Sequence, residues 1–203
     1  MKLIGMLDSP YVRRVAISAK CLGIPLEHQS VSVFRHFEQF QQINPVVKAP
    51  TLVLDNGDVL IDSTLIIDYL EALASPGRTL MPGELDQRLR ALRLTGLALA
   101  ACEKSVQLYY ERTLRPAEIQ YEPWVERVEG QLAAAYSALE RELEFDPLTT
   151  DGSIGQAGIS VAVAWNFSKL VVPEQVDSER FPRINAFTEY AEQLEEFLNT
   201  PTE

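Results

Sequence analysis

Cysteine and histidine are both scarce in this chain, which has 203 residues and only two of each. Cys21 and Cys102 stand far apart and outside any C-x-x-C pair, which argues against a disulfide framework and a thiolate metal site. His28 and His36 are too few for a histidine metal site. We therefore expect a protein whose chemistry uses no metal.

Long apolar runs and basic clusters are lacking too. No segment reaches the roughly 18 apolar residues of a membrane span, and the N-terminus has no signal-peptide run. Asp and Glu number 29 against 18 Lys and Arg, so the net charge is -11, and no basic block stands out. These observations argue against a membrane or a nucleic acid as partner, and they predict a cytoplasmic protein.

What the sequence does contain is a mixed pattern of short strands and helices over its first eighty residues. The turn at 55–57 (D-N-G) is a strong hairpin signal. In order, the pattern predicts a strand at 2–6, a helix at 10–22, a strand at 26–31, a weak helix at 37–42, strands at 51–54 and 58–61, and a helix opening at 62. This order is typical of a thioredoxin-like domain, a small mixed sheet with helices on its faces.

Beyond a turn-rich stretch at 75–83, the pattern becomes helical and no convincing strand remains. Periodicity predicts helices at 85–113, 121–143, 153–170 and 183–198, and the third is apolar enough to be buried. Gln156 can complete a capping box at the start of that helix, although Gly158 weakens its helix propensity. We therefore predict an α/β domain at 1–76 followed by an all-helical domain at 85–203.

Three turns of the first domain fall where open α/β sheets gather ligands, at the carboxyl ends of strands and the N-termini of helices. Ser9 follows the first strand, 48–50 (K-A-P) precedes the third, and 62–63 (D-S) follows the fourth. Each also has a purely structural interpretation, because the serines can cap helices and Lys48 can be solvated. A proline before an apolar strand can also be cis, which would leave the backbone of Ala49 open to an extended peptide.

The sequences around these turns are similar to three motifs of one family. Residues 9–13 (S-P-Y-V-R) resemble its S-P-[FY]-x-R start, residues 44–52 (N-P-V-V-K-A-P-T-L) its N-P-x-G-K-V-P-x-L loop, and residues 62–70 (D-S-T-L-I-I-D-Y-L) its [ED]-S-x-x-I-x-x-Y-L segment. At this spacing, and followed by a helical half, the chain resembles the cytosolic glutathione S-transferases, most of all the bacterial members with a serine active site. Val47 departs from the family, which often has glycine there.

The resemblance implies that the first domain binds glutathione as a co-substrate. Ser63, at a helix N-terminus, is assigned to the γ-glutamyl carboxylate, and Asp62 to the ammonium group beside it. Ala49 would pair through its backbone with the cysteinyl unit if Pro50 is cis, and Lys48 would face the glycyl carboxylate.

The same resemblance makes Ser9 the catalytic residue, as a hydrogen-bond donor to the glutathione thiolate. It is no nucleophile, because no histidine is placed to activate it. Lowering a thiol pKa from ~8.5 to roughly 6.5 needs about 2.7 kcal/mol. One charge-assisted hydrogen bond of ~1.5–3 kcal/mol and a helix terminus of ~0.3–1 kcal/mol can supply it. Arg13 and Arg14 open the helix after Ser9, where either can be solvated or reach a carboxylate.

The helical domain is expected to carry the pocket for the electrophile. The candidate residues are Tyr109, Tyr110, Arg112 and Trp165. Aromatic side chains on long helices are also typical of a core, so that interpretation stays open for them.

The leading prediction is a glutathione transferase that attacks a small hydrophobic electrophile in detoxification and works as a homodimer. Two alternatives stay open. One is a non-enzymatic member of the fold that acts as a binding or regulatory protein, and the other is a glutathione-dependent isomerase or dehalogenase that uses the same thiolate. Phe34 and Phe37 could dock a partner, but we expect them to be buried.

Overall fold

The computed structural model describes residues 1–202, which form two compact units. One unit holds Met1–Leu80 and the segment from Leu194 onward, and the other holds Met81–Gln193. The expected domains at 1–76 and 85–203 stay a prediction. The two compact units differ from them mainly in grouping the segment from Leu194 with the first part of the chain.

The first unit is built on a four-stranded mixed sheet with the strand order β2-β1-β3-β4. Its strands are β1 (Lys2–Ile4), β2 (Glu27–Gln29), β3 (Thr51–Val53) and β4 (Val59–Ile61). β1 runs parallel to β2 and antiparallel to β3, and β3 and β4 form the predicted hairpin. The thioredoxin-like order predicted from the sequence is therefore confirmed.

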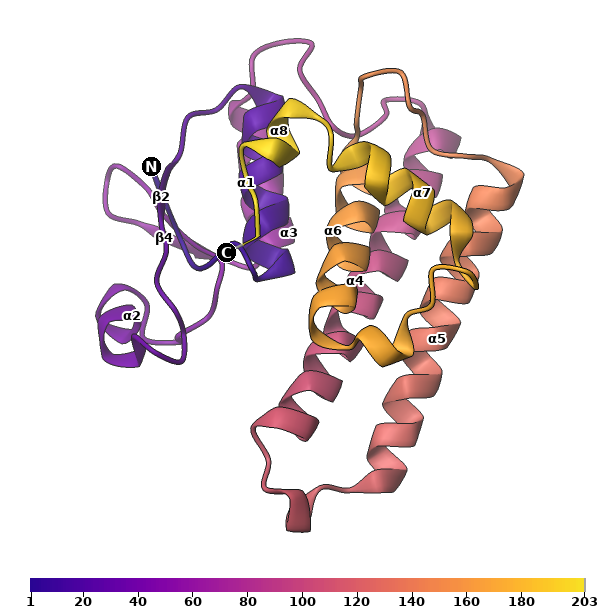
Figure 1. Cartoon of the computed structure of the whole chain (residues 1–203). Helices are drawn as coiled ribbons and strands as arrows, with labels where there is room; N and C mark the ends of the chain where they lie inside the picture. The colour runs from indigo at the N-terminus through magenta and orange to yellow at the C-terminus, as the bar shows by residue number, and fades with distance from the viewer. Residues whose placement is uncertain (203) are drawn as a thin grey trace. The chain divides into compact units, whose positions relative to one another are not determined.

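Helices cover both faces of this sheet (Figure 1). The helices of the first unit are α1 (Pro10–Leu22), α2 (Phe37–Ile43), α3 (Ser63–Leu73) and the short α8 (Glu195–Leu198). Ile4 points toward α2, where it packs with Phe40 and Val31. Leu3 points the opposite way because side chains alternate along a strand. On that second face α1 and α3 pack side by side, and α8 packs on α1.

The second unit is all helical within residues 81–193, as predicted. Its helices are α4 (Leu85–Thr113), α5 (Glu122–Phe145), α6 (Gln156–Val171) and α7 (Pro182–Ala191), with short 3₁₀ turns η1 (Ala117–Ile119) and η2 (Pro173–Gln175). α4 and α5 form a long antiparallel hairpin (Figure 1), and α6 packs against α4 and α7. α6 is buried along almost its whole length, which agrees with its apolar sequence.

The single helix predicted at 183–198 is wrong. The chain instead forms α7, leaves the helical path near Glu192, and starts α8 at Glu195 in the first unit. Phe197 becomes fully buried there. Helical periodicity alone could not reveal this break, because α8 is fixed by contacts with residues almost two hundred positions earlier.

Candidate functional site

Ser9 stands at the start of α1, where its backbone carbonyl accepts from the N–H of Arg13 at 2.9 Å. Its side chain makes no capping hydrogen bond, and the hydroxyl has no hydrogen-bond partner within residues 1–202. The purely structural interpretation of Ser9 as a side-chain cap is therefore wrong. Arg35 reaches the Sδ of Met6 at 3.2 Å, and the backbone carbonyl of Met6 accepts from the Ser9 N–H. The sequence pattern did not single out this cation beside the turn.

The loop before β3 is held by a short chain of hydrogen bonds. The Nδ2 of buried Asn44 donates to the Oγ1 of Thr51 at 2.9 Å, and that hydroxyl donates to the carbonyl of Lys48 at 2.7 Å. The Ala49–Pro50 peptide bond is cis. Within residues 1–202, no hydrogen bond uses the backbone N–H or C=O of Ala49. The Lys48 side chain is exposed.

Val47 adopts the backbone conformation that glycine favours. Its φ is 52°, in the left-handed region, where a residue with a Cβ costs roughly 1–2 kcal/mol. Its side chain packs against the core cluster of Ile4, Val31 and Phe40. This packing offsets part of the strain, so the loop keeps its shape although the family's usual glycine is absent.

The start of α3 is capped by Asp62 and not by Ser63. The Oδ1 of Asp62 accepts from the N–H of Thr64 at 2.8 Å. Ser63 is only 3% exposed, and its Oγ accepts from the Nη1 of Arg14 at 3.0 Å. The same Nη1 donates to the Oγ1 of Thr64 at 3.1 Å. Arg14 therefore connects α1 to the first turn of α3, a link that the sequence did not reveal.

Arg13 lies beside Arg14 on the helix and points to a different partner. It is 2% exposed, and its Nε donates to the carbonyl of Thr200 at 2.8 Å. Its guanidinium carbon lies 5.4 Å from the centroid of the Phe197 ring, a cation–π contact. Arg13 thus holds the segment around α8 against α1.

The register of the sheet brings the three predicted turns to one edge. Ile4 pairs with Thr51, and Thr51 pairs with Ile61, so β1 ends, β3 begins and β4 ends side by side. A Cβ built on Gly5 would lie 3.1 Å from the Cβ of Ala49. The chain after β1 and the 48–50 loop are therefore in close contact. The turns that carry the predicted residues of the first unit therefore begin at one edge of the sheet.

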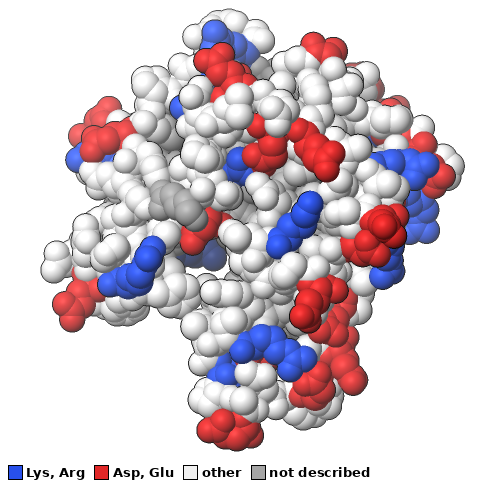
Figure 2. Space-filling model, viewed as in Figure 1, with Lys and Arg blue, Asp and Glu red and all other residues white. Residues whose placement is uncertain are grey.

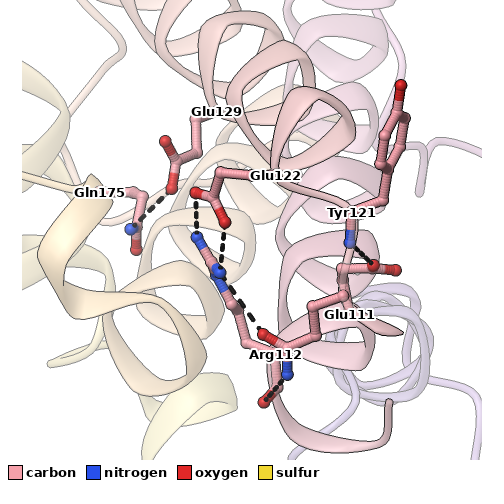
Figure 3. Close-up of polar contacts among 7 residues, drawn as sticks. Glu111, Arg112, Tyr121, Glu122, Glu129 and Gln175 are labelled. Atoms are coloured by element: carbon pink, nitrogen blue, oxygen red, sulfur yellow. Dashed lines mark hydrogen bonds and ion pairs between the residues drawn. The ribbon is translucent and has the colours of Figure 1, made fainter. Parts of the chain in front are cut away.

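Two of the residues predicted for the electrophile pocket are exposed near the end of α4. The rings of Tyr109 and Tyr110 are exposed, with centroids 6.2 Å apart. Arg112, on the same turn, makes two parallel hydrogen bonds with Glu122 of α5, at 2.8 and 3.0 Å (Figure 3). These bonds lower the pKa of Glu122 and raise that of Arg112. The charge of Arg112 is therefore already compensated within the hairpin.

Trp165 belongs to the core of the second unit. It is fully buried, and its ring packs edge-on against Tyr136 and Phe181 with centroids 5.0 and 5.8 Å away. Its Nε1 donates to the Oδ1 of Asn185 at 3.1 Å. The structure does not bring it to the surface with the two tyrosines. We therefore leave Trp165 out of the proposed electrophile site.

Known proteins are similar to this chain in sequence and in fold. The family profile of the glutathione S-transferase N-terminal domain matches residues 3–78. A solved structure of a glutathione transferase family member from Pseudomonas fluorescens Pf-5, with bound glutathione, is 30% identical, with a TM-score of 0.86, and the match covers 100% of this chain and 98% of that one. The chain belongs to the glutathione transferase family.

Further relatives of this glutathione transferase family member match over most of their length. A second structure of a family member from Pseudomonas fluorescens Pf-5, with bound S-(propanoic acid)-glutathione, is 29% identical, covers 100% of both chains and has a TM-score of 0.82. The uncharacterized GST-like protein YibF of Escherichia coli (strain K12) is 29% identical over 164 residues, which are 81% of this chain and 80% of that protein.

The rest of the surface bears on what else this glutathione transferase family member could bind. Figure 2 shows acidic and basic side chains interspersed on the face drawn. None of the helices in residues 1–202 combines the length and apolar character needed to cross a membrane. Within the same residues, no group of three His, Cys, Asp or Glu side chains is arranged to hold a metal ion. With a net charge of -11, attraction for an anionic ligand must come from local groups.

Proposed function

We propose that this protein activates the thiolate of glutathione for attack on a small hydrophobic electrophile, with Ser9 as the catalytic hydrogen-bond donor. The observation that carries the proposal is the Ser9 hydroxyl, which stands at the N-terminus of α1 without serving as its cap. The positive end of the helix dipole favours an anion at that place. The glutathione bound by a relative of 30% identity supports the choice of thiol.

The turns around Ser9 supply the remaining contacts with glutathione. Ser63 and the N–H groups of the first turn of α3 would bind the γ-glutamyl carboxylate. Asp62 uses one oxygen as the helix cap, which leaves the other for the ammonium group. The backbone of Ala49 would pair with the cysteinyl unit as an added strand does. Lys48, which is exposed, would face the glycyl carboxylate.

The helical unit would bind the electrophile through Tyr109 and Tyr110, whose exposed rings offer flat apolar surface. Arg112 is engaged by Glu122 and contributes little net charge, which favours an uncharged electrophile. We also propose that the protein forms a homodimer in the cytoplasm, as the family resemblance implies. A glutathione-dependent isomerase or dehalogenase would use the same thiolate and would be recognised by its substrate.

Replacing Ser9 by Ala tests this proposal directly. Turnover of a chlorodinitrobenzene should fall about 10- to 1000-fold, the range for losing one aimed donor. The ultraviolet absorbance of the thiolate, titrated with bound glutathione, should show a raised pKa in this variant. The free energy of unfolding should change by less than the ~1 kcal/mol of a true cap, because the hydroxyl makes no capping bond.

Ser9→Thr keeps a hydroxyl and is the matched control, which should retain more turnover than Ser9→Ala. Equal turnover in wild type and Ser9→Ala would mean that a group other than Ser9 contacts the glutathione sulfur. Binding of glutathione without turnover of any electrophile would instead favour the non-enzymatic, regulatory interpretation.

A further inference from the structure

Arg14 has no part in the catalytic step described above, yet it is buried at the proposed carboxylate site. It is 2% exposed, and its Nη1 lies 3.0 Å from the Ser63 Oγ and 3.1 Å from the Thr64 Oγ1. We infer that Arg14 is a positioning residue, which orients the Ser63 hydroxyl toward the γ-glutamyl α-carboxylate and makes glutathione binding depend on that carboxylate. This inference rests on the proposed function.

The direction of the Ser63 hydroxyl follows from its hydrogen-bond inventory. A serine hydroxyl has one proton to donate and two lone pairs that accept, whereas a guanidinium only donates. Because Arg14 donates into one lone pair of Ser63, the hydroxyl proton cannot point at Arg14. Ser63 is the first residue of α3, where the nearby backbone N–H groups are donors as well. Within residues 1–202 the Ser63 hydroxyl proton has no acceptor, so it is available to a carboxylate placed at the helix start.

The positive charge of Arg14 also favours a carboxylate at the start of α3. The guanidinium of Arg14 stays protonated at every accessible pH. It contacts the first turn of α3, whose N–H groups already form the positive end of the helix dipole. The two effects add in favour of an anion at this place. An exposed lysine would attract an anion less strongly than buried Arg14 does, since surface charges are screened by water and salt.

Arg13 provides a matched control on the same helix turn. It is equally buried, but its Nε donates to the carbonyl of Thr200 and its guanidinium lies over the ring of Phe197. A substitution at Arg13 removes a buried arginine from α1 and leaves the contact between Arg14 and Ser63 intact. An effect that is specific to the α3 site should therefore appear in Arg14 variants and be missing from Arg13→Lys.

The test compares glutathione with γ-aminobutyryl-Cys-Gly. This analogue lacks only the γ-glutamyl α-carboxylate and keeps the ammonium group. In Arg14→Gln the dissociation constant and the KM for glutathione should rise about 10- to 100-fold, the range for losing a charge-assisted contact. The kcat at saturating glutathione should stay within about twofold, because the sulfur lies at Ser9. The analogue should bind wild type and Arg14→Gln alike. Arg13→Lys should keep the wild-type KM within about twofold.

Ser63→Ala gives a second readout that does not depend on the folding of Arg14 variants. Ser63→Ala should weaken the binding of glutathione and leave the binding of the analogue unchanged. In the double variant, with Arg14→Gln added, the two losses of glutathione affinity should be less than additive. Equal weakening of both ligands in either variant would overturn the inference. So would an unchanged KM for glutathione in a folded Arg14→Gln protein. A wild-type protein that binds neither ligand would contradict the proposed function instead.

Discussion

Burial controls the reactivity of Cys21, the thiol of the first unit. Burial raises the pKa of this thiol to about 12, and the negative charge of Glu196 adds to the rise. The thiolate is the reactive form. Alkylation of Cys21 by iodoacetamide near pH 8 should therefore be about a thousandfold slower in the folded than in the unfolded protein. Mass spectrometry of timed samples measures both rates, and equal rates would show that the thiol is accessible and ionised.

The same pKa fixes how Cys21 affects stability. In the unfolded chain the thiol loses its proton above about pH 8.5, whereas the folded protein keeps it. The free energy of unfolding contributed by this group is therefore complete below that pH and declines as the pH rises beyond it. Urea unfolding at a series of alkaline pH values should show a shallower decline in Cys21→Ala than in wild type.

The contacts of individual side chains could be predicted only in part from the sequence. The motifs pointed to Ser9, the 48–50 loop and the 62–63 turn, but not to the difference between Arg13 and Arg14. Two adjacent arginines on a helix differ by about a hundred degrees in direction, and only the neighbouring elements decide what each contacts. The expected burial of Phe34 and Phe37 is wrong, because they are 55% and 50% exposed.

At the scale of elements, α6 shows a helix that forms without the cap the sequence suggested. The capping box is absent, since the Ser153 N–H donates to the Oδ1 of Asp151 and no side chain caps the helix start at Gly155. The helix still begins at Gln156. Because 12 of the 16 residues of α6 are buried, tertiary packing outweighs the missing cap and the weak propensity of Gly158.

Gly158 has a packing reason that propensity could not reveal. A Cβ built there would lie 2.9 Å from the Cγ1 of Ile154 and 3.0 Å from the Cζ of Phe187. Gly158→Ala should therefore destabilise the protein by about 1–3 kcal/mol, although alanine is the better helix former.

Gly130 in α5 is the matched control, because a Cβ built there would meet no neighbouring atom within 4 Å. Gly130→Ala should stabilise the protein by about 0.5–1 kcal/mol. Urea unfolding of the two variants measures both effects. A stabilising Gly158→Ala would mean that Ile154 or Phe187 moves aside without cost.

At the scale of the whole molecule, the two-part pattern of α/β then all-α was predictable because each half has its own periodicity. The assignment of the segment from Leu194 was not. It depends on contacts between distant residues, such as the hydrogen bond between Arg13 and Thr200, which are 187 positions apart, and the packing of Phe197 against Arg13. No local pattern carries information over that distance.

Exposed leucines on α4 predict that two copies of the chain associate. Leu85, Leu89 and Leu92 follow one another along one face of α4 and are exposed. An apolar stripe of this kind is typical of a surface that another protein covers, and the family resemblance implies a second copy of the chain. Leu89→Lys should shift the protein toward monomer in sedimentation experiments, whereas Lys in place of Leu170, an exposed leucine of α6, should not. A wild type that stays monomeric at high concentration would contradict the homodimer.

The docking of α8 also sets an order of events during synthesis. Residues 81–193 leave the ribosome before Phe197 and Thr200 do, so Arg13 meets its partners only after the whole helical unit has been translated. Until then the start of α1, with Ser9 on it, lacks the segment that packs against it. The first unit, whose N-terminal part is synthesised first, is therefore the last to be completed.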